Sequence, residues 1–327
     1  MTKEKSRAKS GLSEADVAQF HRDGYLVVPD LLDPERHLAP VIDEYQTRLR
    51  SLRDVWVAQG LLPKTGRPEG FCEGIKEAAA AGIDFFQPLD ISLPLDSVEA
   101  DTPFHAGPAT FALLTAPPLL DAVEALIGPE ITSNPIQHVR IKPPARDVSR
   151  GERRAHVTAT SWHQDRAVTL SEADETRMVT AWLAVTDATQ DNGCLKVLPG
   201  SHKGLMLHHC PVPQLAIPDQ FIDEAAAVPL PVRAGGVVLF HPLTVHGSLD
   251  NRSDSVRWSF DLRYNTTGDP TGRPLFPAFV ARSKAYPDTV LTDPLAWRQS
   301  WLDARSTLAA SPPREFHRWP ADAALCA

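Results

Sequence analysis

Several features are scarce or missing in this chain of 327 residues. The cysteines are four, they are far apart, and they form no CxxC pair: Cys72, Cys194, Cys210 and Cys326. Because disulfide frameworks are uncommon in so long a chain, we expect reduced thiols and a cytoplasmic location. No stretch approaches the roughly 18 apolar residues that a membrane-spanning helix needs, and the polar N-terminus does not resemble a signal peptide. We therefore expect no membrane partner.

Positive charge is also in short supply. Lys and Arg number 33 against 41 Asp and Glu, so the formal net charge is −8. No basic run is long enough to form a phosphate-binding stripe, which argues against a nucleic-acid partner. A glycine-rich phosphate loop, a Ser-His-Asp string and an HExxH string are missing as well. We expect a small-molecule substrate, and the oligomeric state stays open between a monomer and a homodimer.

The N-terminal part of the sequence indicates helices joined by loops. The expected elements are a helix that begins after a capping box at Ser13–Asp16 and ends at Gly24, a strand at 25–28, and helices over 34–52 and 119–127. Residues 60–110 are rich in proline and glycine, and we expect them to form loops on the rim of a pocket.

From residue 131 onward, short β-rich runs separated by turns replace the helices. They are 136–141, 156–162, 179–185, 195–198, 237–240 and 256–264. Helices followed by many short strands predict an α+β chain with a mainly β core of barrel or jelly-roll type. A late helix is expected from Pro294 to Leu308, with Trp297 and Trp301 packed in the core.

The first string that indicates chemistry is His163-Gln-Asp165. On a strand, residues i and i+2 point to the same face, so an imidazole and a carboxylate would reach one point. This pair suits a divalent first-row metal, although His-x-Asp also arises often by chance. His246 follows a buried strand and adds a second histidine, which gives a two-histidine, one-carboxylate triad. Such a triad leaves part of the coordination sphere of iron(II) open.

Arg257 follows His246 by eleven residues, across the turn at 250–255. A hairpin would bring it beside the metal, and arginine is suited to bind a small carboxylate through two hydrogen bonds. Along its strand the polar side chains Arg257, Ser259, Asp261 and Arg263 alternate with Trp258, Phe260, Leu262 and Tyr264. This alternation predicts a lined cavity on one face. Asp261 and Arg263 would there form either an internal ion pair or a contact with a polar substrate.

Together these strings resemble the phytanoyl-CoA dioxygenase-like branch of the 2-oxoglutarate oxygenases. The resemblance runs from about Leu12 to Tyr264 and includes the strings 20–28, 162–165, 191–204 and 246–248 with Arg257. It implies a double-stranded β-helix (a jelly-roll, cupin-like fold) with N-terminal helices packed on one sheet. We expect a single oxygenase domain over 1–327, with a disordered tail over 1–11, a core over 131–265 and a C-terminal extension over 266–327.

The resemblance also implies roles for individual residues. His163, Asp165 and His246 resemble the ligands of iron(II), and Arg257 resembles the arginine that binds the distal carboxylate of 2-oxoglutarate. Further co-substrate contacts, by position in the family pattern, are Ser248, Trp182 and His138, with Gln137 added only because it is adjacent. The implied cofactors are iron(II), 2-oxoglutarate as co-substrate and O2, and ascorbate is a candidate reductant.

The implied reaction is hydroxylation of an unactivated C–H bond in a small metabolite or natural-product intermediate, with succinate and CO2 as co-products. An acyl-CoA 2-hydroxylase of the same family is the first alternative. A metal-dependent hydrolase or isomerase, or a non-catalytic metal-binding protein, is the alternative from another class. We expect His202 to be a turn residue bonded to the backbone and His241 to be structural, on the opposite face of its strand. The string His208-His-Cys210 offers soft metal ligands, but we expect it to form a solvated loop.

Overall fold

The computed structural model describes residues 11–64, 66, 68–83, 86–95, 97–148, 157–211, 214–311, 318–320 and 324–326. The expected N-terminal tail therefore lies almost wholly outside the described residues. The helices are α1 (Glu14–Asp23), α2 (Ala39–Ala58), α3 (Phe71–Ala80), α4 (Pro108–Leu114), α5 (Pro117–Ile127) and α6 (Pro294–Ala309). The strands are β1 (Tyr25–Val28), β2 (Ile131–Lys142), β3 (Met178–Ala184), β4 (Leu195–Val197), β5 (Val228–Leu230), β6 (Val237–Phe240), β7 (His246–Ser248), β8 (Arg257–Thr266) and β9 (Phe279–Arg282).

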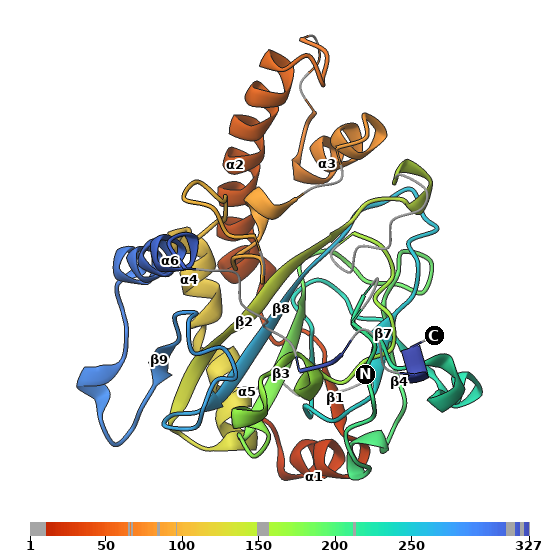
Figure 1. Cartoon of the computed structure of the whole chain (residues 1–327), viewed down its shortest axis with the longest axis vertical. Helices are drawn as coiled ribbons and strands as arrows, with labels where there is room; N and C mark the ends of the chain where they lie inside the picture. Colours follow the sequence, from red (N-terminus) through yellow and green to blue (C-terminus); the bar gives the residue numbers. More distant parts are fainter. Residues whose placement is uncertain are drawn as a thin grey trace, which may run out of the picture.

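The strands form two antiparallel sheets (Figure 1). The larger has the order β1-β6-β3-β8-β2-β9, and the smaller has the order β5-β4-β7. An apolar cluster joins the two sheets, with Trp182 and Phe240 from the larger sheet against Leu195 and Leu230 from the smaller. The helix and antiparallel-sheet content agrees with the α+β prediction.

Helices cover the other face of the larger sheet, as expected for the N-terminal helices. Helix α5 contacts β2, β3 and β8, and α2 stands at the end of the sheet beside α3 (Figure 1). The aromatic face of β8 packs into this layer: the Trp258 ring lies 5.1 Å from Tyr45 and 4.3 Å from Phe71. Trp297 and Trp301 of α6 are fully buried in the same core, which confirms their predicted structural role.

The first helix and strand follow the sequence prediction. Ser13 and Asp16 form the capping box of α1, and Gly24 ends it in the left-handed conformation with φ 80°. A side chain at Gly24 would also collide, because an added Cβ would lie 2.3 Å from His202 Nδ1. The Nε2 atom of His202 is 3.1 Å from the carbonyl oxygen of His21, so His202 is a structural turn residue, as expected.

Other elements differ from the prediction. Residues 60–110 are not all loop, because α3 lies within them and packs so closely on α2 that a Cβ at Gly74 would lie 2.8 Å from Leu49. The proline and glycine residues around this helix made the segment resemble a loop in the sequence. The helix expected to end at 52 continues through α2 to Ala58, and the short strands β5 and β9 were missed. The strand expected at 156–162 does not form over the described residues 157–162, although the backbone N–H of Ser248 donates a hydrogen bond to the carbonyl oxygen of Thr160.

One expectation drawn from an absence is wrong and one observation needs correction, while the expected lack of a membrane partner stays a prediction. Cys210 and Cys326 are joined by a disulfide, although 116 positions separate them in the sequence, so only Cys72 and Cys194 are free thiols. Sequence spacing carries no information on a contact made only by the folded chain. Among the described residues, Pro108–Ile127 is also long and apolar enough to cross a membrane by length and composition alone. This segment is the helix pair α4 and α5, and half of it is buried in the core.

Candidate metal centre and its cationic neighbours

His163, Asp165 and His246 come together between the two sheets. His163 and His246 exchange backbone hydrogen bonds of 2.9 and 3.0 Å. The chain then turns, because Asp165 begins a one-turn helix (Asp165–Val168) rather than continuing a strand. Asp165 Oδ1 lies 3.8 Å from His163 Nε2, and Oδ2 lies 3.9 Å from His246 Nε2. All three residues are buried, and one ligand atom from each lies within 4.8 Å of the others.

Each of the two imidazoles directs one ring nitrogen at the space shared with Asp165. His163 Nδ1 lies 2.9 Å from the carbonyl oxygen of Ser161, and His246 Nδ1 lies 2.9 Å from that of Thr244. A ring nitrogen facing a carbonyl carries the proton, so each Nε2 keeps a lone pair directed at the shared space. Burial, assisted by the charge of His246, lowers the pKa of His163 to about 3. Neutral imidazole is the form that binds a metal.

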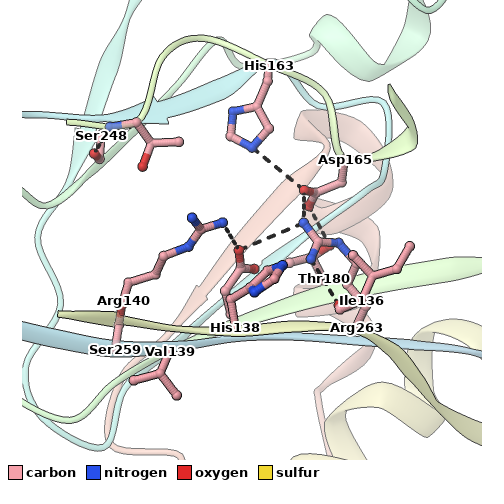
Figure 2. A network of polar contacts seen from close by, with 12 residues as sticks. Ile136, His138, Val139, Arg140, His163, Asp165, Thr180, Ser248, Ser259 and Arg263 are labelled. Carbon is pink, nitrogen blue, oxygen red and sulfur yellow. Dashed lines mark hydrogen bonds and ion pairs between the residues drawn. The ribbon is translucent and has the colours of Figure 1, made fainter. Parts of the chain in front are cut away.

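Asp165 is held at both oxygens. Arg263 donates to Oδ1 and the Thr180 hydroxyl donates to Oδ2 (Figure 2). Burial acts to raise the pKa of Asp165, but the nearby positive charge of Arg263, together with His246 and His163, outweighs it, so this pKa lies below the ordinary value. The carboxylate is therefore ionised and oriented, which is how a metal-binding carboxylate is usually supported.

Arg140 and Asp261 form a second ion pair beside the triad. Arg140 Nη2 donates to Asp261 Oδ2 at 2.9 Å, and Arg263 lies 3.8 Å from the same oxygen. The side chains of Arg140, His163 and Asp165 point toward one another in Figure 2. Burial acts to raise the pKa of Asp261, but Arg263 and Arg140 hold it well below the usual range. Asp261 and Arg263 thus take part in internal ion pairs, one of the two predicted possibilities.

Arg257 is placed differently from the prediction. β7 belongs to the smaller sheet and β8 to the larger, so His246 and Arg257 are not neighbours in a hairpin. Both nevertheless line the same small cavity between the sheets. Arg257 donates to Ser259 Oγ at 2.8 Å and to Gly193 O at 3.2 Å, and its guanidinium lies 5.3 Å from the Trp182 ring. Burial lowers its pKa to about 9.

Lys142 is a buried cation that the sequence analysis missed. It pairs with Arg257 in the β2–β8 register. Its Nζ atom donates to Ser248 Oγ at 2.6 Å and to Thr160 Oγ1 at 3.1 Å. Burial first, then the charge of Arg257, lowers its pKa well below the usual value of a lysine. Alternation along β2, in which His138, Arg140 and Lys142 share a face, was the signal that could have identified it.

Residues of this arrangement line two cavities. The small one, of about 20 Å3, is lined by His163 and His246 and also by Trp182 and Arg257. The large one, of about 1020 Å3, shares Thr160 with the small cavity and is also lined by Ser248. The predicted site residues that line a cavity are therefore the two histidines, Trp182, Arg257 and Ser248.

His138 and Gln137 line neither cavity. His138 Nδ1 lies 2.9 Å from Asp90 Oδ2, in a pair at the edge of the site. Gln137 is the adjacent residue in β2, so its side chain points to the opposite side of the strand. Its assignment rested on adjacency alone and stays a prediction.

Other histidines hold the backbone around the site. His241 Nδ1 accepts from Leu243 N, and its burial lowers its pKa to about 4, in line with the expected structural role. His209, the middle residue of the string expected to be a solvated loop, is instead fully buried and accepts from Gln164 N at 3.0 Å. His208 lies in the same loop and is partly exposed, and its Nε2 lies 3.5 Å from Cys326 Sγ.

The sequence of this chain matches a known protein family over most of its length. The family model described as phytanoyl-CoA dioxygenase (PhyH) matches residues 20–259, which is most of the chain. The chain belongs to the phytanoyl-CoA dioxygenase family. This confirms the resemblance seen in the sequence, and the family is one of iron(II)- and 2-oxoglutarate-dependent oxygenases.

Relatives and solved structures are similar over different lengths. The human peroxisomal phytanoyl-CoA dioxygenase is 32% identical over 168 residues, which cover 49% of this chain and 47% of that protein. The zebrafish (Danio rerio) phytanoyl-CoA dioxygenase domain-containing protein 1 is 38% identical over 103 residues, 29% of this chain and 35% of that protein. The chain thus matches half or less of the length of these two relatives.

Two solved structures are similar in fold. The non-heme monooxygenase ThoJ matches with a TM-score of 0.57 at 22% identity, over 90% of this chain and 96% of its own. The epimerase SnoN in complex with Fe3+, alpha ketoglutarate and nogalamycin RO matches with a TM-score of 0.50 at 22% identity, over 86% and 92%. At these identities the similarity concerns the fold of this PhyH-family chain.

Proposed function

We propose that this PhyH-family chain is an iron(II)- and 2-oxoglutarate-dependent dioxygenase that hydroxylates an unactivated C–H bond of a small molecule. One observation carries the proposal. The two histidines of a buried His-Asp-His cluster line the same small cavity as Arg257, a buried guanidinium. The cluster suits iron(II), and the guanidinium suits the distal carboxylate of 2-oxoglutarate.

The triad fits iron(II) in its chemistry. His163 and His246 offer neutral Nε2 atoms, and Asp165 offers an ionised oxygen fixed by Arg263. Two imidazoles and one carboxylate are the donor set of mononuclear iron oxygenases. When bound, the metal would supply the oxidative chemistry that couples decarboxylation of 2-oxoglutarate to attack on a C–H bond. The protein contributes orientation and a site shielded from water.

A dicarboxylate would complete the other end of the site. Neither Arg257 nor Lys142 has a carboxylate partner among the described residues; hydroxyl and carbonyl oxygens accept their hydrogen bonds. We assign both cations, with Ser248, to the distal carboxylate and Trp182 to the adjacent wall. A metal-dependent hydrolase or isomerase needs the triad but no buried cation pair beside it, so this pair favours the oxygenase.

The sheet order supports assignment of the fold to the double-stranded β-helix. The larger sheet brings β2, β8, β3 and β6 side by side, and the smaller brings β5, β4 and β7, with 157–163 bonded to β7 through Thr160 and His163. Eight segments alternating between two sheets in this way form a jelly-roll. The triad would then lie between the sheets, where His163 and His246 meet.

We favour a free small molecule over an acyl-CoA as the substrate. The large cavity lies at the upper end of the size range of small-molecule sites. Among the described residues, its charged lining is acidic in excess: Asp191, Asp219, Glu224 and Asp250 against Lys196 and Arg252. Such a lining does not attract the phosphates of coenzyme A.

Succinate release tests the reaction class. The purified protein is loaded with iron(II) and incubated with 2-oxoglutarate, O2 and ascorbate, and succinate is measured. We expect slow uncoupled succinate formation, absent in Asp165→Ala and retained in Glu73→Ala, an exposed control on α3. No succinate from an iron-loaded, folded protein, with and without candidate substrates, would contradict the oxygenase assignment.

Comparing substrate classes tests the proposal that the substrate is a free small molecule. Free acids, amino acids and neutral natural products are compared with acyl-CoA thioesters for acceleration of succinate release. Acceleration by a free molecule supports the preferred class. Acceleration by an acyl-CoA alone would replace it with the acyl-CoA 2-hydroxylase alternative and leave the reaction class intact.

A further inference from the structure

The Cys210–Cys326 disulfide lies beside the large cavity, so its oxidation or reduction would affect the neighbourhood of the metal site. Both cysteines are partly exposed, and both line the large cavity. Of the two free thiols, Cys194 is buried and Cys72 is partly exposed, and burial raises the pKa of each. Accessible sulfur atoms are the ones that take part in thiol–disulfide exchange.

One side of the disulfide belongs to the C-terminal strap, which we define as residues 318–320 and 324–326. Arg318 Nε donates to the carbonyl oxygen of Thr169 at 2.9 Å. Trp319 Nε1 donates to the carbonyl oxygen of Ala167 at 2.9 Å. The strap therefore lies along the short segment that directly follows Asp165.

The other side belongs to the loop 205–210, which contacts the same string of residues. His209 Nε2 accepts from Gln164 N at 3.0 Å, and Gln164 Oε1 accepts from Leu207 N at 2.8 Å. The His209 ring lies 5.1 Å from the Trp319 ring. Gln164 stands between His163 and Asp165 in the sequence, so the loop and the strap both pack on the segment that carries two members of the triad.

The position of His208 makes the two sulfur atoms of the disulfide unequal as leaving groups. Its Nε2 atom lies 3.5 Å from Cys326 Sγ, within hydrogen-bonding distance for sulfur. A thiolate that forms next to an imidazole N–H is stabilised, and a stabilised thiolate is the better leaving group. We propose that the Cys210–Cys326 disulfide is a reversible, thiol-sensitive clasp that fastens the strap to the loop 205–210 and is opened by attack at Cys210. This proposal does not rest on the proposed function.

The reaction is an exchange with a small thiol. A thiolate attacks Cys210 Sγ, the bond between the two cysteines breaks, and Cys326 leaves as a thiolate beside His208. A second thiolate attacks the small-thiol sulfur of the mixed disulfide, which releases Cys210 and forms the disulfide of the reagent. Two molecules of thiol supply two electrons and two protons, and both cysteines end as thiols. The reverse exchange with the oxidised reagent closes the clasp.

Trapping the intermediate tests the direction of attack. Native wild-type protein is treated with glutathione, quenched with acid and a maleimide, and analysed by peptide mass. We expect the mixed disulfide mainly on Cys210, with several-fold slower reduction and loss of this preference in His208→Gln. His21→Gln, an exposed histidine change on α1, should behave as wild type. Equal trapping on both cysteines in the wild type would contradict the role of His208.

The same samples test whether the clasp exists and opens. If the maleimide alkylates Cys210 and Cys326 before reduction, no disulfide forms. If the disulfide resists glutathione until the protein is denatured, it is a permanent structural bond. Either result overturns the proposal. Hydrogen exchange should rise in the loop 205–210 after reduction and stay unchanged in β3. Unchanged hydrogen exchange in the loop would show that the disulfide does not hold the loop against the strap, and would also contradict the proposal.

Discussion

The two ends of the buried polar site differ in how their charges are matched. At the metal end, Arg263 donates to Asp165, so cation and carboxylate compensate each other. At the other end, Arg257 and Lys142 have only hydroxyl and carbonyl partners among the described residues. A buried charge without an opposite charge is unfavourable, and both pKa values are lowered accordingly. Under the proposed function, the metal end is therefore preformed, whereas the cationic end is completed by the bound dicarboxylate.

Removing a triad ligand should have the largest effect. In His163→Ala, we expect iron(II) affinity to fall by more than the roughly 10–100-fold that follows loss of an outer partner, because a direct ligand is lost. Anaerobic titration with iron(II) measures this. Asp261→Asn, which keeps all three ligands, should bind metal far better than His163→Ala; equal loss in both would place the metal elsewhere.

Removing the guanidinium at the cationic end should separate co-substrate binding from metal binding. In Arg257→Met, we expect the Kd of 2-oxoglutarate to rise by at least about 30-fold, because a buried charged hydrogen-bond partner is worth roughly 2–5 kcal/mol. Iron(II) affinity should stay near that of the wild type. Calorimetry under anaerobic conditions measures both, with the exposed Arg146→Met as control. Unaltered 2-oxoglutarate binding would remove Arg257 from the site.

Lys142 should give a smaller effect that depends on pH. Its pKa is lowered in the free protein and should rise when a carboxylate binds beside it. Its contribution to affinity is therefore full below the free-state pKa and lost as pH rises through the bound-state pKa. In Lys142→Met, we expect about tenfold weaker binding at low pH and a flatter pH profile. A profile identical to the wild type would show that Lys142 does not contact the ligand.

The support of Asp165 should show the smallest effect. In Thr180→Val, one of the two hydrogen bonds to the carboxylate is lost, and we expect about tenfold weaker iron(II) binding. Thr180→Ser keeps a hydroxyl and should recover most of the affinity. Equal weakening in both variants would point to packing of the methyl group instead.

Local patterns were sufficient to predict much of this arrangement. Alternation in β8 placed Arg257 and Asp261 on the cavity face and Trp258 in the core, because strand side chains point to opposite faces in turn. The capping box at Ser13 likewise located α1, since its hydrogen bonds lie within one turn. Features whose cause lies within a few residues of sequence are readable in this way.

Features created by contacts between distant segments were not readable. The disulfide joins Cys210 to a residue near the chain end, and Arg257 reaches the cavity from the sheet opposite His246. Lys142 acquires its environment from Ser248, a residue of the other sheet. Sequence spacing predicted that Arg257 and His246 belong to one site, but the proposed hairpin was the wrong reason.

The most direct test of the two-ended site is the visible spectrum of the anaerobic protein. Iron(II) is added to the apo-protein without oxygen, and 2-oxoglutarate is then titrated in. We predict a weak metal-to-ligand charge-transfer band in the green that saturates with one co-substrate per chain, is absent in His163→Ala, and needs more 2-oxoglutarate in Arg257→Met. Absence of the band in wild-type protein with bound iron would contradict the oxygenase assignment and favour a hydrolytic or purely metal-binding role.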